Sequence, residues 1–138
     1  MFKIELVKLD EFDTTAGHIY SITLDGSDKT LYDLFLEKNY MCFRHELQEI
    51  VYKLKIMSSQ TGFIDSFFKL NERKTANKLC VITDFKGKLK LYCIRIDDIL
   101  LILGGDENQS KLTVSKMIIK QIYNIIKSNY TLQSTLTS

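Results

Sequence analysis

The sequence contains no proline, and its 138 residues include only three cysteines and two histidines. Without proline and without a low-complexity run, no segment has the composition of a linker between domains. Apolar residues make up 45% of the chain, which is enough to build a core. We therefore expect a single domain over residues 1–138, with strands and a short helix in 1–40, the main core in 41–130 and a frayed tail in 131–138.

The cysteines form an odd set, Cys42, Cys80 and Cys93, and no two of them have C-x-x-C spacing. This pattern predicts buried thiols, because neither a disulfide framework nor a zinc site follows from it. Neither His18 nor His45 stands beside a cysteine, so a conventional metal site has too few ligands. We expect no metal and no cofactor.

Long apolar runs are also missing. The longest, residues 99–103, has the length of a strand, whereas a membrane span needs about 20 apolar residues. The N-terminus mixes charged with apolar residues instead of forming the apolar region of a signal peptide. We therefore expect a cytoplasmic protein that does not contact a membrane.

Hydrophobic periodicity predicts an α+β fold, in which an antiparallel sheet packs against helices. Alternation with a period of two indicates strands at residues 2–6, 20–24, 79–84, 89–96 and 99–103. Apolar stripes with helical spacing indicate helices at residues 29–38, 43–57 and from about 110 onward, with a brief helical turn at 63–68. Because residues 99–103 are apolar at every position, we expect this strand to lie in the interior of the sheet.

Positive charge is concentrated late in the chain, where residues 86–127 hold eight lysines and arginines against four acidic residues. Strand alternation places Lys88, Lys90 and Tyr92 on one face and Arg95 on the other. Cations beside an aromatic ring suit RNA, because lysines neutralise phosphates while rings stack on bases. The alternative is an ordinary solvated sheet face. For Arg95 the alternative is a structural ion pair.

The stretch from Lys88 to Gly105, KLKLYCIRIDDILLILGG, resembles the hairpin of the RelE/ParE/HigB superfamily of small bacterial toxins. The stretches 46–54 and 62–71 also resemble RelE-like proteins. The resemblance covers about two thirds of the chain, and it implies a RelE-like core in residues 41–130. It further implies a type II toxin that cleaves mRNA on the ribosome without a metal and is neutralised by an antitoxin protein.

The strand arginine of these toxins best matches Lys90, which the resemblance makes the principal catalytic candidate. The other candidate catalytic residues are Tyr92 and Lys111, and the candidate RNA-binding residues are Lys86, Lys88 and Arg95. The toxins supply further basic residues after the central strand, where this chain has the acidic run that begins at Asp106. A non-catalytic protein-interaction module or inactivated relative from a mobile element is therefore an alternative. A third possibility is an unrelated small structural or regulatory domain from a mobile element, in which the N-terminal strands supply the edge of a homodimer.

Overall fold

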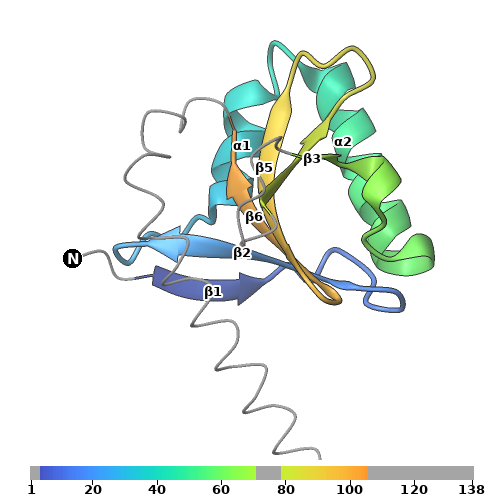
Figure 1. Ribbon diagram of the computed structural model, residues 1–138. Helices are drawn as coiled ribbons and strands as arrows, with labels where there is room; N and C mark the ends of the chain where they lie inside the picture. The colour runs from blue at the N-terminus through green and yellow to red at the C-terminus, as the bar shows by residue number, and fades with distance from the viewer. Residues whose placement is uncertain (1–3, 71–78, 106–138) are drawn as a thin grey trace, which may run out of the picture. The chain divides into compact units, whose positions relative to one another are not determined.

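The computed structural model describes residues 4–70 and 79–105, which belong to one compact unit (Figure 1). Within these residues the fold is α+β, as the periodicity predicted. The elements follow the order β1 (Ile4–Lys8), β2 (His18–Leu24), α1 (Leu31–Asn39), α2 (Arg44–Ile56), β3 (Lys69–Leu70), β4 (Leu79–Thr83), β5 (Lys90–Ile96) and β6 (Ile99–Gly104). A π-helical turn, Met57–Thr61, follows α2, and a 3-10 turn, Asp65–Phe67, precedes β3.

The described strands form one sheet in the order β1-β2-β6-β5-β4-β3, so β6 lies in its interior as expected. The prediction of an antiparallel sheet is corrected at one pair, because β2 runs parallel to β6 with Tyr20 opposite Leu101. The short strand β3 was not predicted either. The N-terminal hairpin thus joins the same sheet as the later strands.

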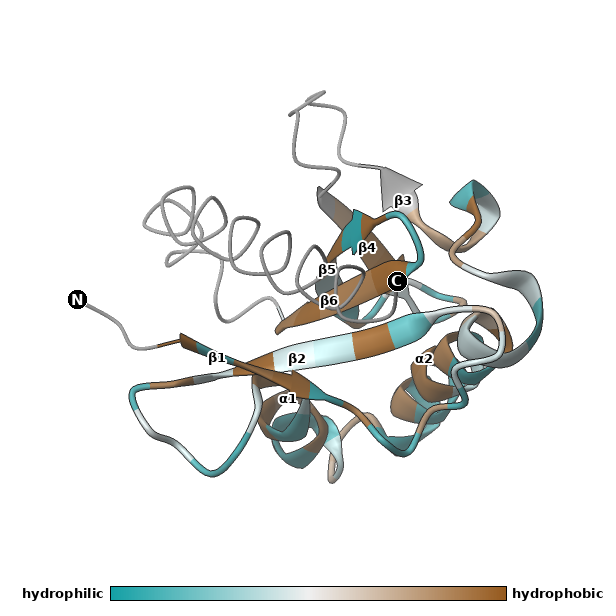
Figure 2. Ribbon diagram, turned by 90° about the horizontal axis from the view of Figure 1, so that it is seen from below, coloured by the Kyte–Doolittle hydropathy of each residue, from teal (hydrophilic) through white to brown (hydrophobic). Residues whose placement is uncertain are grey.

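Both α1 and α2 cover the same face of the sheet (Figure 2). Their inward side chains, such as Phe35 and Leu54, are buried against Leu91 and Leu100. Apolar side chains also occupy the opposite face, where Ile94 and other residues are buried. Strand β5 is therefore buried on both faces over most of its length.

Helix α1 begins two residues later than the sequence predicted. Its N-cap is Thr30, whose hydroxyl accepts a hydrogen bond from the Asp33 N–H at 3.1 Å, while the Asp33 carboxylate accepts one from the Thr30 N–H at 3.0 Å. This reciprocal pair satisfies two N–H groups that the first turn of a helix otherwise leaves free.

Two of the expected buried thiols are buried, and the third is not. Cys80 and Cys93 lie opposite each other on β4 and β5 within the core, whereas Cys42 is exposed between α1 and α2. Burial raises the pKa of Cys80 to about 12 and raises that of Cys93 well above its ordinary value. The predicted loop at residues 71–78, the predicted last helix and the predicted tail lie outside the described residues.

Candidate functional site

The turn between β4 and β5 is fixed by its own hydrogen bonds. The buried Asp84 carboxylate accepts from the Leu89 N–H at 2.8 Å and from the Lys86 N–H at 3.2 Å. The Gly87 N–H donates to the Asp84 carbonyl oxygen at 3.0 Å, and Gly87 has a φ of 72°, a conformation that favours glycine. The turn therefore has a defined shape without help from a ligand.

Helix α2 holds the same turn from the side. The Glu49 carboxylate accepts a hydrogen bond from the Phe85 N–H at 2.6 Å, and the Lys53 ammonium donates one to the Thr83 carbonyl oxygen at 2.6 Å. Both bonds involve a charged group, which makes them stronger than bonds between neutral groups. These bonds fix the backbone on which the side chain of Phe85 stands.

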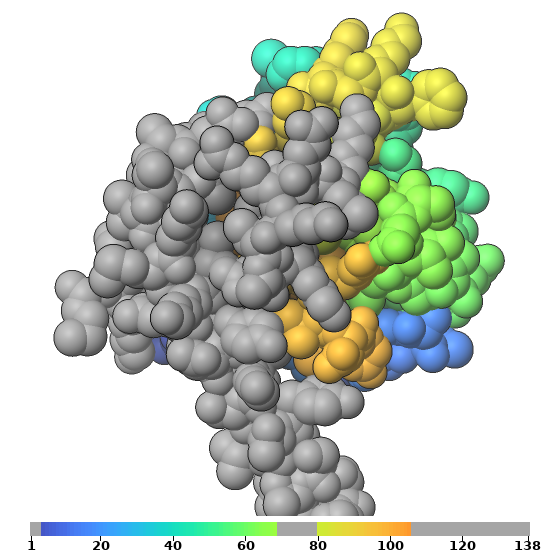
Figure 3. All heavy atoms as spheres, in the orientation of Figure 1, coloured from blue at the N-terminus to red at the C-terminus, as the bar shows by residue number. Residues whose placement is uncertain are grey.

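Phe85 is 91% exposed, the largest exposed fraction among the large hydrophobic side chains of the described chain. A phenylalanine ring in water forgoes the burial that would stabilise the fold, by roughly 1.5–3 kcal/mol. Lys86, Lys88 and Lys90 follow it, and all three are exposed. We call residues 85–90 the basic turn; it forms part of the yellow region that stands out at the top of Figure 3.

Three of the sequence-predicted residues, Lys86, Lys88 and Lys90, lie in the basic turn, and Lys90 is also the first residue of β5. Lys90 begins β5 opposite Thr83, on the face of the sheet that points away from the helices. Lys88 lies 3.8 Å from the Glu46 carboxylate, a loose contact that leaves the lysine about half exposed. Within the described chain, Lys86 and Lys90 have no ion-pair partner.

Tyr92 shares the face of Lys90, as the alternation predicted, but it is only 8% exposed. The expectation that its ring meets a ligand on a solvated surface therefore does not fit its surroundings. The exposed ring of this region is that of Phe85, which was not among the residues predicted from the sequence. The signal was an aromatic residue inside an otherwise polar turn, between Asp84 and Lys86.

Arg95 lies on the helix-covered face, and its side chain is only 18% exposed. Its guanidinium contacts the Asp65 carboxylate at 2.6 Å and donates to the Phe63 carbonyl oxygen at 3.0 Å. It also stacks on the Phe68 ring, with 5.2 Å between the guanidinium carbon and the ring centre. These contacts make Arg95 a structural residue that ties β5 to the segment after α2, so the RNA-binding role predicted for it is not supported.

Lys111, the third candidate catalytic residue, lies outside the described residues.

Within residues 4–70 and 79–105, no group of three or more histidine, cysteine or acidic side chains is placed to hold a metal ion. None of the helices in that part of the chain has the length and apolar content of a membrane span.

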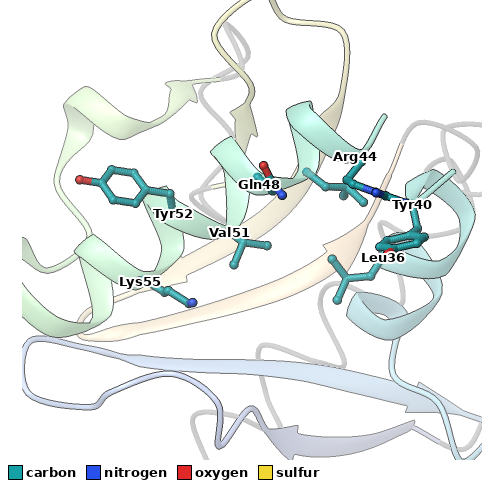
Figure 4. Close-up of a pocket in the computed structure, with 8 residues that line it drawn as sticks. Leu36, Tyr40, Arg44, Gln48, Val51, Tyr52 and Lys55 are labelled. Carbon is teal, nitrogen blue, oxygen red and sulfur yellow. The ribbon is translucent and has the colours of Figure 1, made fainter. Parts of the chain in front are cut away.

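A concave surface lies between α1 and α2 (Figure 4). We call it the helical groove; it is open to solvent and has a volume of about 590 Å³. Its lining residues are Leu36, Tyr40, Arg44, Leu47, Gln48, Val51, Tyr52 and Lys55. The groove and the basic turn use different residues of α2.

Comparison of the chain with protein-family models, with curated proteins and with solved structures found no match.

Proposed function

We propose that this chain is an RNA-binding protein that contacts single-stranded RNA with the basic turn, and that it acts as an mRNA-cleaving toxin of the RelE type. The observation that supports RNA binding most directly is the exposed Phe85 ring beside three exposed lysines, on a backbone already fixed by α2. Ring stacking and phosphate neutralisation are the two interactions with which proteins bind single strands without reading their sequence.

A preformed turn favours binding because little conformational entropy is lost when the RNA arrives. The hydrogen bonds of Glu49, Lys53 and Asp84 hold the backbone between Thr83 and Leu89 before any ligand is present. Phe85 then stacks on one base, while Lys86, Lys88 and Lys90 contact the phosphates on either side of it.

The proposed cleavage is attack of a ribose 2′-hydroxyl on the adjacent phosphorus, with departure of the 5′-oxygen of the next nucleotide. Negative charge grows on the phosphate oxygens during this step, so nearby cations stabilise the transition state. We assign this role to Lys90, the residue that best matches the strand arginine of the toxins. The side chain is exposed and has no ion-pair partner among the described residues, so it is available to a phosphate.

Binding is tested with a short fluorescein-labelled single-stranded RNA, whose anisotropy is measured at several salt concentrations. Replacing Lys86, Lys88 and Lys90 together by alanine should reduce the slope of log affinity against log salt by about 0.7 for each phosphate that a lysine no longer neutralises. Replacing Lys8, Lys29 and Lys38 by alanine removes the same charge elsewhere and serves as the matched control. Equal slopes for the two triple variants would refute binding through the basic turn.

The contribution of Phe85 is tested separately with Phe85→Ala and Phe85→Tyr. Loss of base stacking should weaken RNA binding about tenfold in Phe85→Ala, and the tyrosine variant should keep most of it. A duplex of the same sequence offers no free base face, so its affinity should not change in Phe85→Ala. An equal loss of affinity for the single strand and for the duplex would contradict the stacking of Phe85 on a base.

Cleavage is tested with ribosomes translating a defined message, in the presence of the wild-type chain or of Lys90→Ala. Cut products that appear only with the wild-type chain support the toxin. Intact message, together with RNA binding in the anisotropy experiment, would instead support the inactivated relative that the acidic segment after β6 suggested.

A further inference from the structure

The helical groove is built by one side of α2 and the end of α1, and it combines apolar side chains with two cations and one amide. Arg44, Gln48, Val51 and Lys55 recur at intervals of three or four residues along α2, and therefore point to one side of the helix. Figure 4 shows Val51 between the two cations along α2, and Leu36 on α1 across the groove.

The apolar side chains of the groove are partly open to solvent. Tyr52 is 65% exposed and Tyr40 is 52% exposed, and Leu36 and Val51 are half-buried. Leu47, which lies beneath them, is already buried against the sheet. An additional apolar stripe laid into the groove would remove further apolar surface from water, which is the main driving force of protein association.

The charges of the groove are of one sign. Arg44 and Lys55 are eleven residues apart, which is about three turns of helix and roughly 16 Å. None of the lining residues is acidic. The acidic side chains of α2 are engaged elsewhere, since Glu49 binds the Phe85 N–H and Glu46 lies next to Lys88.

We propose that the helical groove binds an amphipathic helix of a partner protein, one with an apolar stripe and with acidic side chains about three turns apart. Such a helix would place its stripe on Leu36 and Val51 and one acid at each cation. Grooves between helices commonly bind partner helices in this way, with anchors at intervals of three and four residues. Complementary charge at the two ends would fix the position of the bound helix along the groove.

The charges also argue against a second copy of the chain as the occupant. In a two-fold dimer through this groove the same surface faces itself, so Arg44 and Lys55 of both copies would come together. Like charges in an interface are unfavourable. A partner that carries acids at these positions avoids this repulsion.

The proposal is tested with two synthetic helical peptides that share a leucine stripe. One peptide carries two glutamates eleven residues apart, and its twin carries two lysines at the same positions. Anisotropy of the fluorescein-labelled peptides is measured with the full chain. The glutamate peptide should bind at least about tenfold more tightly than the lysine peptide, because two attractive contacts are replaced by two repulsive ones.

The chain variants complete the test. Arg44→Glu combined with Lys55→Glu should reverse the preference, so that the lysine peptide binds more tightly. Val51→Gln changes a half-buried position and should weaken both peptides without unfolding the chain, which circular dichroism verifies. The triple alanine variant of Lys86, Lys88 and Lys90 should bind the peptide like the wild type, which separates this proposal from RNA binding.

Absence of binding by either peptide, equal binding of the two, or a preference that survives the double charge reversal would each overturn the proposal. Vesicles that contain phosphatidylserine are tested in parallel. Binding of the chain to vesicles through Val51 and Lys55, with no binding to the glutamate peptide, would assign the groove to a lipid surface.

Discussion

Ser21 of β2 donates a hydrogen bond from its hydroxyl to the carbonyl oxygen of Ile102 in β6, with 3.0 Å between the two oxygens. The same hydroxyl oxygen accepts a hydrogen bond from the Tyr32 N–H at the start of α1, at 3.2 Å. Ser21 is fully buried. One small side chain thus joins the N-terminal hairpin, the central strand and the first helix, at the parallel pair that the sequence did not predict.

Ser21→Ala should therefore lower the free energy of unfolding by about 1–3 kcal/mol, because it leaves the Tyr32 N–H buried without this partner. Urea denaturation followed by circular dichroism measures the change. Ser66→Ala, at an exposed position, serves as the control and should change stability by less than about 0.5 kcal/mol. Equal stability of the two variants would show that the hydrogen bonds of the Ser21 hydroxyl do not stabilise the fold.

Glu49→Gln should loosen the basic turn without unfolding the chain. The substitution keeps the size of the side chain but removes its charge, so the hydrogen bond from the Phe85 N–H weakens by about 1 kcal/mol. Hydrogen exchange at the Phe85 amide should become several-fold faster, while exchange at the core amide of Leu91 should not change. A Phe85 amide that exchanges as slowly as in the wild type would contradict the contact with α2.

Arg95→Ala should lower stability and Lys90→Ala should lower RNA affinity, although both remove one positive charge from β5. Removing Arg95 leaves the Phe63 carbonyl without its donor and the Asp65 carboxylate without its cation, so stability should fall by about 1–3 kcal/mol. RNA affinity per folded molecule should not change. Lys90→Ala should leave stability within about 0.5 kcal/mol and weaken RNA binding. Thermal denaturation and the anisotropy titration together distinguish the two residues.

The three cysteines should differ in reactivity. Thiolates are the reactive form, and burial raises the pKa of Cys80 to about 12, so this thiol stays protonated at neutral pH. Cys93 is buried beside it, while Cys42 is exposed. A chromogenic disulfide reagent should therefore react with one thiol of the native chain and with three after denaturation. Cys42→Ser identifies the native site, and it should abolish the native reaction.

The helices and most strands of the described chain could be predicted from the sequence, because their apolar residues repeat with clear periods. The parallel pairing of β2 with β6 could not. The alternation of Tyr20, Ile22 and Leu24 indicates a half-buried strand, but the identity and direction of its neighbour depend on contacts about 80 residues apart. Capping of α1 by Thr30 was also missed, since Ser27 and Asp28 are equally suitable cap residues by type.

The candidate site shows the same division. Alternation correctly placed Lys90 and Tyr92 on one face, but it carries no information about how deeply that face is covered. Arg95 was rightly considered for an ion pair, although its partner, Asp65, comes from a 3-10 turn thirty residues earlier instead of the neighbouring aspartates. Phe85 was missed because its one local signal, an aromatic residue inside a polar turn, does not show that hydrogen bonds from α2 fix the backbone around it.

Helix α2 supports both proposed binding surfaces, since Glu49 and Lys53 hold the basic turn while Val51 and Lys55 line the helical groove. A ligand that shifts α2 when it binds to the helical groove also shifts Glu49 and Lys53, and so alters their hydrogen bonds to the basic turn. Thermodynamic linkage then requires that RNA and the partner helix change each other's affinity by the same factor. A protein bound in the helical groove would in this way change the affinity of the basic turn for RNA without contacting the RNA.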